Sequence, residues 1–136
     1  MRKKFRVNNQ WKFTSGFPKA KGLYNYHRAR AFSGRGLIVT ECPWGAIRLH
    51  QAGLPNAVAL LGTSASAAQL AMLAKAPKLL LLFDGDAAGR EGAERLRAAC
   101  EAVPAVSGLL PEGADPDDLT DGQLRGIAQG AGILFS

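Results

Sequence analysis

An uninterrupted apolar run, Leu79–Phe83, is the feature of this 136-residue chain that most restricts its fold. Five apolar residues in succession are typical of a strand that is buried on both faces, as the strands of parallel sheets are. The run ends at Asp84, and Asp86 follows after one glycine. Because side chains alternate along an extended chain, we expect these two carboxylates to point the same way. Paired carboxylates at the end of a rigid strand suit a hard cation such as Mg²⁺.

Segments typical of strands alternate along the chain with segments typical of helices. The predicted strands cover 36–41, 56–61 and 79–83, with a fourth inside 103–110. The predicted helices cover 23–31, 44–52, 65–75, 87–102 and 121–129. This alternation indicates an α/β fold in which a mainly parallel, four-stranded sheet has helices on both faces. The length suits a single core, and no apolar stretch reaches the ~20 residues that span a bilayer, so no membrane partner is expected.

Charge is distributed very unevenly along the chain. Residues 1–83 contain 13 Lys and Arg and one acid, a net charge of +12, whereas residues 84–136 contain 4 Lys and Arg and 10 acids, a net charge of −6. A basic arm over residues 1–35, rich in aromatic residues, precedes the part of the chain that suits a metal. This arrangement favours a polyanionic substrate. The alternative is that the basic arm only aids solubility.

Acidic residues stand at or just after the ends of the predicted strands. Glu41 ends the first strand, Asp84 and Asp86 follow the third, and Asp115 and Asp117 follow the fourth. Since the carboxyl ends of parallel strands meet at one edge of a sheet, this placement predicts a single metal site there. Each acid also has a structural alternative. Asp86 and Asp115 can cap the helices that follow them, and Glu41 can pair with an arginine.

Two features near the predicted strand ends suit a phosphate group. Free amide groups at the start of the helix predicted at 87–102 favour binding of an anion such as phosphate. Arg90 either neutralises the charge of that phosphate or simply lies in solvent. The Gly-Thr-Ser turn at 62–64 is favoured as a capping turn over a phosphate loop. Trp44 and the aromatic residues of the arm are favoured as core residues over base-stacking platforms.

Cysteine and histidine give little evidence for a second site. Cys42 and Cys100 are too few for a disulfide framework and lack a CxxC partner, which favours a reducing, cytoplasmic compartment and argues against zinc. Cys42 directly follows the strand-end glutamate, so it is expected near the predicted metal site. His27 and His50 stand far apart in the sequence, and core or surface roles are favoured over metal ligation.

Four segments of the chain resemble a known family, the Toprim domains, and most of all those of bacterial-type DNA primases. They are 37–41 (LIVTE), 60–64 (LLGTS), 83–90 (FDGDAAGR) and 110–119 (LPEGADPDDL). Their order, spacing and strand-end placement all fit, and the third and fourth are the most specific. A segment before the first strand resembles the one that enters the Toprim domain in those primases, so the resemblance covers residues 13–120.

The resemblance implies a Rossmann-like Toprim core over residues 36–136, with residues 1–35 leading into it. It also implies Mg²⁺- or Mn²⁺-dependent phosphoryl transfer on nucleic acid, specifically the synthesis of RNA primers. The implied partners are a single-stranded DNA template and nucleotides, together with other primase modules or a helicase. Complete primases of this family carry a zinc-ribbon module and a helical carboxy-terminal part, so activity is expected to need modules beyond this domain.

The resemblance assigns roles to individual residues of this chain. Glu41 would be the general acid or base, or a carboxylate beside the metal. Asp84 and Asp86 would be catalytic through the metal, and Asp115 and Asp117 would complete its ligands. Contacts to nucleic acid or phosphate are expected from five basic residues, Arg90, Lys19, Lys21, Arg28 and Arg30.

Two positions depart from the pattern of those primases. A glycine usually follows the strand-end glutamate and a second acid stands four residues beyond it, whereas this chain has Cys42 and Gly45. Two alternatives to primer synthesis therefore stay open: a Toprim nuclease, and a nucleic-acid-binding module with a reduced catalytic site. A more distant alternative is an unrelated α/β protein whose Asp84 and Asp86 bind nucleotide-sugars, against which the acidic segment at 115–118 argues.

Overall fold

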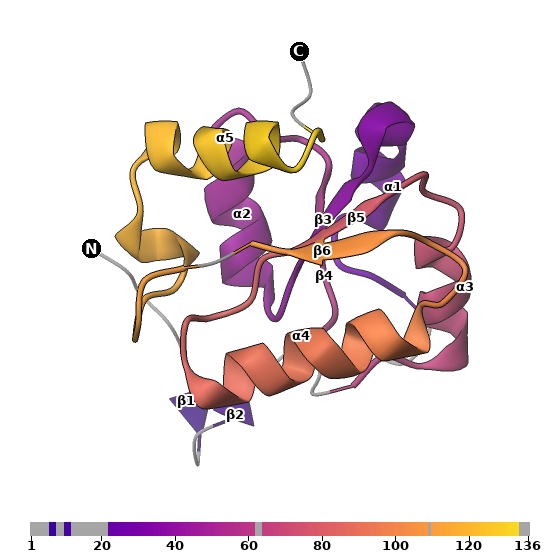
Figure 1. Ribbon diagram of the computed structural model, residues 1–136, viewed down its shortest axis with the longest axis horizontal. Coiled ribbons are helices and arrows are strands. Elements are labelled where there is room, and N and C mark those ends of the chain that lie inside the picture. Colours follow the sequence, from indigo (N-terminus) through magenta and orange to yellow (C-terminus); the bar gives the residue numbers. More distant parts are fainter. Residues whose placement is uncertain (1–5, 8–9, 12–21, 62–63, 109, 134–136) are drawn as a thin grey trace.

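A parallel sheet forms the centre of the fold. A computed structural model describes residues 6–7, 10–11, 22–61, 64–108 and 110–133. The sheet strands are β3 (Leu37–Thr40), β4 (Ala57–Ala59), β5 (Leu79–Leu81) and β6 (Ala105–Ser107). All neighbours are parallel, in the order β4-β3-β5-β6, and Ile38 of β3 lies between Ala57 and Leu80 (Figure 1). The predicted fold class is confirmed, since a helix connects each strand to the next.

Helices cover both faces of this sheet. They are α1 (Tyr26–Ala29), α2 (Pro43–Gln51), α3 (Ala67–Leu73), α4 (Ala87–Ala99) and α5 (Asp121–Gly130), with 3₁₀ helices η1 (Arg30–Arg35) and η2 (Pro116–Asp118). In Figure 1, α2 and α5 lie above the sheet and α4 lies below it. Side chains from α1, α3 and α4 share one apolar cluster, and those of α2 and α5 share the other.

The alternation of the central strand produces these two apolar clusters. Leu79, Leu81 and Phe83 enter the cluster under α3 and α4, and Leu80 and Leu82 enter the cluster under α2 and α5. All five are at most 6% exposed. Burying a leucine stabilises the fold by roughly 2 kcal/mol, so this run anchors the sheet and the loop that follows it.

Polar side chains fix the starts of two helices. Ser66 and Gln69 form a reciprocal capping box at α3, and Thr120 does the same with Gln123 at α5. Gln69 is 2% exposed, and its amide also donates to the Leu60 carbonyl at 2.7 Å. The helix predicted at 65–75 therefore begins two residues later, because its N-cap is Ser66 and not the preceding turn.

The helix predicted at 23–31 is divided into two parts. Asn25 has a left-handed backbone conformation, with φ 69°, and α1 begins only after it. The chain then continues as η1, with a non-helical conformation at Phe32. Leu23 and Ala29 are nonetheless buried in the core, so part of the segment predicted as an arm packs against the sheet.

A polar contact joins α1 to the carboxyl end of α2 and to β4. Asn25 Nδ2 donates to the Ala57 carbonyl at 3.1 Å and faces His50 Nε2. Because the Asn25 amide nitrogen only donates, His50 Nε2 accepts and the ring proton resides on Nδ1. Burial lowers the pKa of His50, the charge of Arg28 lowers it further, and a hydrogen bond to the Pro55 backbone opposes both.

Two further strands precede this domain. Arg6–Val7 (β1) and Gln10–Trp11 (β2) pair antiparallel. Among the helices of the described ranges, none combines the length and apolarity needed to cross a membrane. Whether a domain boundary lies at residue 35 stays a prediction.

Candidate metal centre

The strand order brings two of the predicted acids together. The chain runs from β3 to β4 on one side and then to β5 on the other, so β3 and β5 form a topological switch point. In such sheets, ligands bind beyond the carboxyl ends of the strands at this point. Glu41 directly follows β3 and Asp84 follows β5, and Glu41 Oε1 accepts a hydrogen bond from the Asp84 N–H at 2.8 Å.

Two glycines allow the loop after β5 to pack tightly. A Cβ at Gly85 would lie 2.2 Å from the Pro111 carbonyl oxygen, and a Cβ at Gly89 would lie 2.0 Å from the Asp84 carbonyl oxygen. Two backbone hydrogen bonds of 2.8 Å, from Gly85 to Ala114 and from Gly113 to Gly85, bind the neighbouring turn to this loop. Gly85 of the Asp-Gly-Asp segment and Gly89 of α4 are therefore required by close backbone contact, which fixes where Asp84 stands.

The third acidic segment is built around η2. Asp115 accepts a hydrogen bond from the Asp117 N–H at 2.9 Å, and Asp118 accepts one from the Asp115 N–H at 2.9 Å. Asp115 therefore caps η2, which was the structural alternative to its predicted role as a metal ligand. Arg48 of α2 donates to the Leu119 carbonyl, the C-cap of η2, at 2.8 Å.

Arg48 is the side chain that holds this segment against α2. Its guanidinium also pairs with Asp121 at 2.7 Å, and the Arg48 side chain is only 15% exposed. One planar group therefore bridges α2, the end of η2 and the start of α5. No sequence pattern indicated this contact, because Arg48 lies 71 residues from its carbonyl partner.

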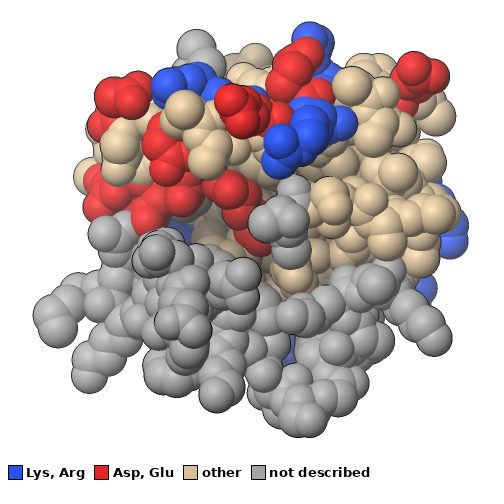
Figure 2. Space-filling view, turned by 90° about the horizontal axis from the view of Figure 1, so that it is seen from below, with Lys and Arg blue, Asp and Glu red and all other residues tan. Residues whose placement is uncertain are grey.

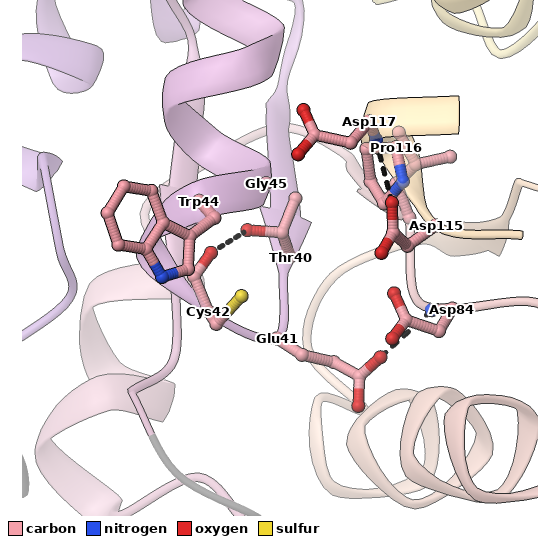
Figure 3. Close-up of a pocket in the computed structure, with 10 residues that line it drawn as sticks. Thr40, Glu41, Cys42, Trp44, Gly45, Asp84, Asp115, Pro116 and Asp117 are labelled. Carbon is pink, nitrogen blue, oxygen red and sulfur yellow. Dashed lines mark hydrogen bonds between the residues drawn. The ribbon is translucent and has the colours of Figure 1, made fainter. Parts of the chain in front are cut away.

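The three acidic segments meet around one hollow that is open to solvent (Figure 3). Its lining residues are Thr40, Glu41, Cys42, Trp44, Gly45, Leu82, Asp84, Asp115, Pro116 and Asp117. Four of these ten are carboxylates, and none is Lys or Arg. Figure 2 shows Asp and Glu gathered on the left of the described surface, the side where Figure 1 places the segment between β6 and α5. A group of acids of this kind attracts a cation.

The acids share the hollow without forming a finished ligand cluster. Within the described part of the chain, no three His, Cys, Asp or Glu side chains stand close enough to hold a metal ion. The physical reason is visible in Figure 3: Glu41 is turned to the Asp84 N–H, and Asp115 is turned to the Asp117 N–H. The expected common placement is observed for Glu41, Asp84, Asp115 and Asp117, while their roles stay predictions.

Asp86 lies apart from these four. Its carboxylate caps α4 by accepting a hydrogen bond from the Gly89 N–H at 2.7 Å, and it is not among the residues that line the hollow. The capping alternative is therefore what the structure shows for Asp86. Its distance from the hollow has a simple cause: the chain turns into α4 after Asp84, so strand alternation no longer governs it.

The predicted nucleic-acid-binding residues do not form one group. Arg90 on α4 pairs with Glu112 at 3.0 Å beside the loop that follows β5. Arg28 and Arg30 are exposed at α1 and η1, next to the start of β3 and away from the hollow. Lys19 and Lys21 lie outside the described residues.

Sequence reasoning undervalued two residues of the hollow. Trp44 was expected in the core, yet its side chain is 38% exposed and lines the hollow, because the buried stripe of α2 consists of other residues. Thr40 points from β3 into the hollow and donates to the Cys42 and Val58 carbonyls at 3.1 and 3.2 Å. For Cys42, the sequence already indicated a place near Glu41, because the two residues are adjacent. For Gly45, the sequence did not indicate that it packs against Thr40, because this contact depends on how α2 packs.

Together, the parallel sheet, the acids at the switch point and the Asp-Gly-Asp loop define a class of protein domain, the Toprim domain. The chain belongs to the Toprim-like family, which it matches over residues 38–120. The resemblance to bacterial-type DNA primases, expected from the four sequence segments, is confirmed. The chain is 40% identical over 115 residues to a DNA primase of Helicobacter pylori, a match that covers 80% of this chain and 21% of that protein.

Solved structures give the same answer for the fold. The zinc-binding and RNA polymerase domains of the Aquifex aeolicus primase have a TM-score of 0.78 at 28% identity, covering 90% of this chain and 32% of theirs. A DnaG primase catalytic domain bound to single-stranded DNA has a TM-score of 0.71 at 29% identity, covering 91% of this chain and 44% of its own. The chain thus spans about a fifth of the curated primase that it matches.

Proposed function

We propose that this chain is the catalytic, metal-binding domain of a DNA primase, which joins ribonucleotides into a primer on a single-stranded DNA template. The observation that carries the proposal is the shared hollow, to which β3, β5 and η2 bring carboxylates from three separate segments. Support comes from the relative named DNA primase and from the similar primase domain that is bound to single-stranded DNA. Other primase modules or a helicase are proposed as partners.

The donor set of the hollow fits a divalent cation. Asp84, Asp115 and Asp117 offer carboxylate oxygens, the ligands that Mg²⁺ and Mn²⁺ prefer, and no basic side chain competes for them in the lining. These three residues would hold the ion once their side chains rotate toward the centre of the hollow. When bound, the ion supplies positive charge for the transferred phosphate and activates the attacking hydroxyl.

Glu41 is the proposed proton acceptor. In the proposed reaction, the 3′-hydroxyl oxygen of the growing strand forms a bond to the α-phosphorus of the nucleotide. The bond from that phosphorus to pyrophosphate breaks, and the hydroxyl proton passes to Glu41. A general base needs a defined position, and the hydrogen bond from the Asp84 N–H gives Glu41 one.

The proposed catalytic role of Asp86 has a separate test, because this residue also caps α4. Asp86→Ser keeps a side-chain oxygen for the cap and removes the carboxylate, whereas Asp86→Ala removes both. If Asp86 binds the metal, both variants weaken Mn²⁺ binding, and only the alanine variant loses about 1 kcal/mol of stability. If Asp86 is only a cap, Asp86→Ser binds Mn²⁺ as tightly as the original protein does.

The basic residues are proposed to contact the phosphate backbone. Arg90 stands on the helix that follows the Asp-Gly-Asp loop, and Arg28 and Arg30 are exposed at the opposite edge of the sheet. Lys19 and Lys21 are proposed to act in the same way. Contacts of this type are insensitive to base sequence and weaken as salt rises. Charge-neutral substitutions are therefore expected to reduce the salt dependence of single-stranded DNA binding.

One observation favours a second candidate, a nucleic-acid-binding module with a reduced catalytic site. Gly45 lines the hollow but supplies no side chain, and a Cβ there would lie 3.0 Å from Thr40 Cβ. An acid at this position would need Thr40 to move. This candidate predicts salt-sensitive DNA binding that survives the loss of Asp84, and no primer synthesis.

The proposal is tested by titrating Mg²⁺ or Mn²⁺ into the chain while amide NMR signals are recorded. We expect saturable changes at Glu41, Gly85 and Asp117, and their loss in Asp84→Asn. Glu101→Gln is the matched control, because it removes an exposed carboxylate that does not line the hollow.

Primer synthesis on single-stranded DNA is then measured with the same variants, with the remaining primase modules supplied. Glu101→Gln should support synthesis and Asp84→Asn should not. The proposal fails if no saturable metal signal appears, or if both variants make primers equally well. Metal binding without primer synthesis would favour the second candidate.

A further inference from the structure

An exposed tryptophan stands at the wall of the carboxylate hollow. Trp44 is the second residue of α2, and its side chain is 38% exposed. Figure 3 shows its indole on one side of the hollow and Asp84, Asp115 and Asp117 on the other, with Glu41 between the two sides. An aromatic ring this large usually contributes to stability by being buried.

Trp44 is not among the residues that α2 buries against the core. The helix buries Gly45, Ala46 and Leu49, and Trp44 belongs to neither apolar cluster of the core. Ile47, one turn further along the same helix face, is 36% exposed. The two side chains extend an apolar strip from the hollow along α2. Apart from Trp44 and Ile47, the one similarly exposed large apolar side chain among the described residues is Val106 on β6.

The hollow therefore has two chemically different walls. One carries carboxylates, which can hold phosphates only through a divalent cation. The other carries a flat apolar ring, which offers a stacking surface to any nucleobase. A nucleoside triphosphate with its metal has the matching pattern: a cation and phosphates at one end, and a flat base at the other.

We infer that Trp44 is a positioning residue that stacks on the base of the incoming nucleoside triphosphate, while the carboxylates of the hollow hold its phosphates through the metal. This inference rests on the proposed function, because it needs a metal-bound phosphate in the hollow. Stacking is tolerant of base identity, which suits a site that must accept all four nucleotides in turn. Ile47 would border the base on its outer side.

The test compares two probes that differ in whether they carry a base. Binding of ATP and of inorganic tripolyphosphate is measured by calorimetry in Mg²⁺, for the original protein, Trp44→Ala and Val106→Ala. Trp44→Ala should weaken ATP binding by about 5- to 100-fold and leave tripolyphosphate binding unchanged. Val106→Ala is the matched control, because Val106 is equally exposed, at 38%, but belongs to β6 and does not line the hollow.

A second measurement leaves Trp44 in place. In Trp11→Phe, Trp44 is the only tryptophan, since the sequence contains two. We expect ATP with Mg²⁺ to quench its fluorescence, excited at a wavelength where adenine does not absorb, and tripolyphosphate to leave it unchanged. The quenching should saturate at the ATP concentration given by calorimetry.

Several results would overturn the inference. These are equal ATP affinity in Trp44→Ala and the original protein, ATP binding no tighter than tripolyphosphate, and equal weakening of both probes. Weaker binding of a single-stranded oligonucleotide with unchanged ATP affinity would assign Trp44 to the template instead. If tripolyphosphate itself does not bind in Mg²⁺, the proposed function fails, which is a separate and recognisable outcome.

Discussion

Replacing Gly89 by alanine should distort the junction between α4 and the loop that carries Asp84. The new Cβ would lie 2.0 Å from the Asp84 carbonyl oxygen and 2.8 Å from its carbonyl carbon, whereas ordinary contact begins at 3.4 Å. The shortfall to the oxygen is therefore 1.4 Å. Both atoms belong to the backbone, so neither can rotate away as a flexible side chain would. The first turn of α4 or the loop itself must move.

The expected cost combines three effects. Overpacking of this kind costs about 1–3 kcal/mol. Displacement of the Gly89 N–H from the Asp86 carboxylate, now 2.7 Å away, removes a helix cap worth about 1 kcal/mol. Alanine returns about 1 kcal/mol through its higher helix propensity. The free energy of unfolding should therefore fall by about 2 kcal/mol, with the packing effect deciding the sign.

Gly126→Ala is the matched control for this substitution. Gly126 lies in α5, and a Cβ there would meet nothing within 4 Å, so only helix propensity changes. The free energy of unfolding of this variant should rise by up to about 1 kcal/mol. Urea unfolding followed by far-UV circular dichroism measures both variants against the original protein. If Gly89→Ala is as stable as Gly126→Ala, the close contact described at the Asp84 loop does not exist.

Three further predictions concern Arg48, His50 and the metal. Arg48→Met should lower the free energy of unfolding by about 2 kcal/mol, since it leaves the Leu119 carbonyl without its charged donor. Asp121→Asn should lower it by less than about 1 kcal/mol, because Asp121 is exposed. Equal losses in urea unfolding would contradict the role of Arg48 in holding η2 against α2. Because the pKa of His50 is lowered, its contribution to stability is complete above about pH 6.5 and is lost as pH falls through the folded-state pKa. His50→Gln should remove this loss from unfolding curves recorded between pH 7.5 and 5.5, and the exposed His27→Gln should not. Mg²⁺ at about 100 times its Kd should raise the free energy of unfolding by about 2.7 kcal/mol, and Asp84→Asn should abolish this gain.

Much of the fold follows from local pattern. The apolar run of Leu79–Phe83 predicted a strand buried on both faces, and its side chains do divide between the two apolar clusters. The alternation of strands and helices predicted the parallel sheet, because a chain can return to a parallel strand only through a crossover. Element ends were less predictable. The helices after Asn25 and Ser66 begin later than expected. The left-handed backbone of Asn25 is not evident from the sequence, whereas the spacing of Ser66 and Gln69 is a capping-box signal that the sequence does carry.

The candidate site shows where sequence reasoning stops. The acids Glu41, Asp84, Asp115 and Asp117 were expected together, since parallel strands end at one edge, and they line one hollow. Asp86 was expected beside Asp84 because side chains alternate along a strand, but the strand has ended before Asp86, which is the N-cap of α4.

The sequence by itself determined which segments carry the acids and which elements present them, because periodicity and glycine placement act over a few residues. Only the tertiary structure decided that β3 and β5 are neighbours, which sets Glu41 against the Asp84 N–H across 43 residues of chain. It also decided that Trp44 is exposed at the hollow and that Arg48 holds η2 in place. These contacts join residues far apart along the chain, and their free energies depend on how whole helices pack. No local pattern can therefore encode them.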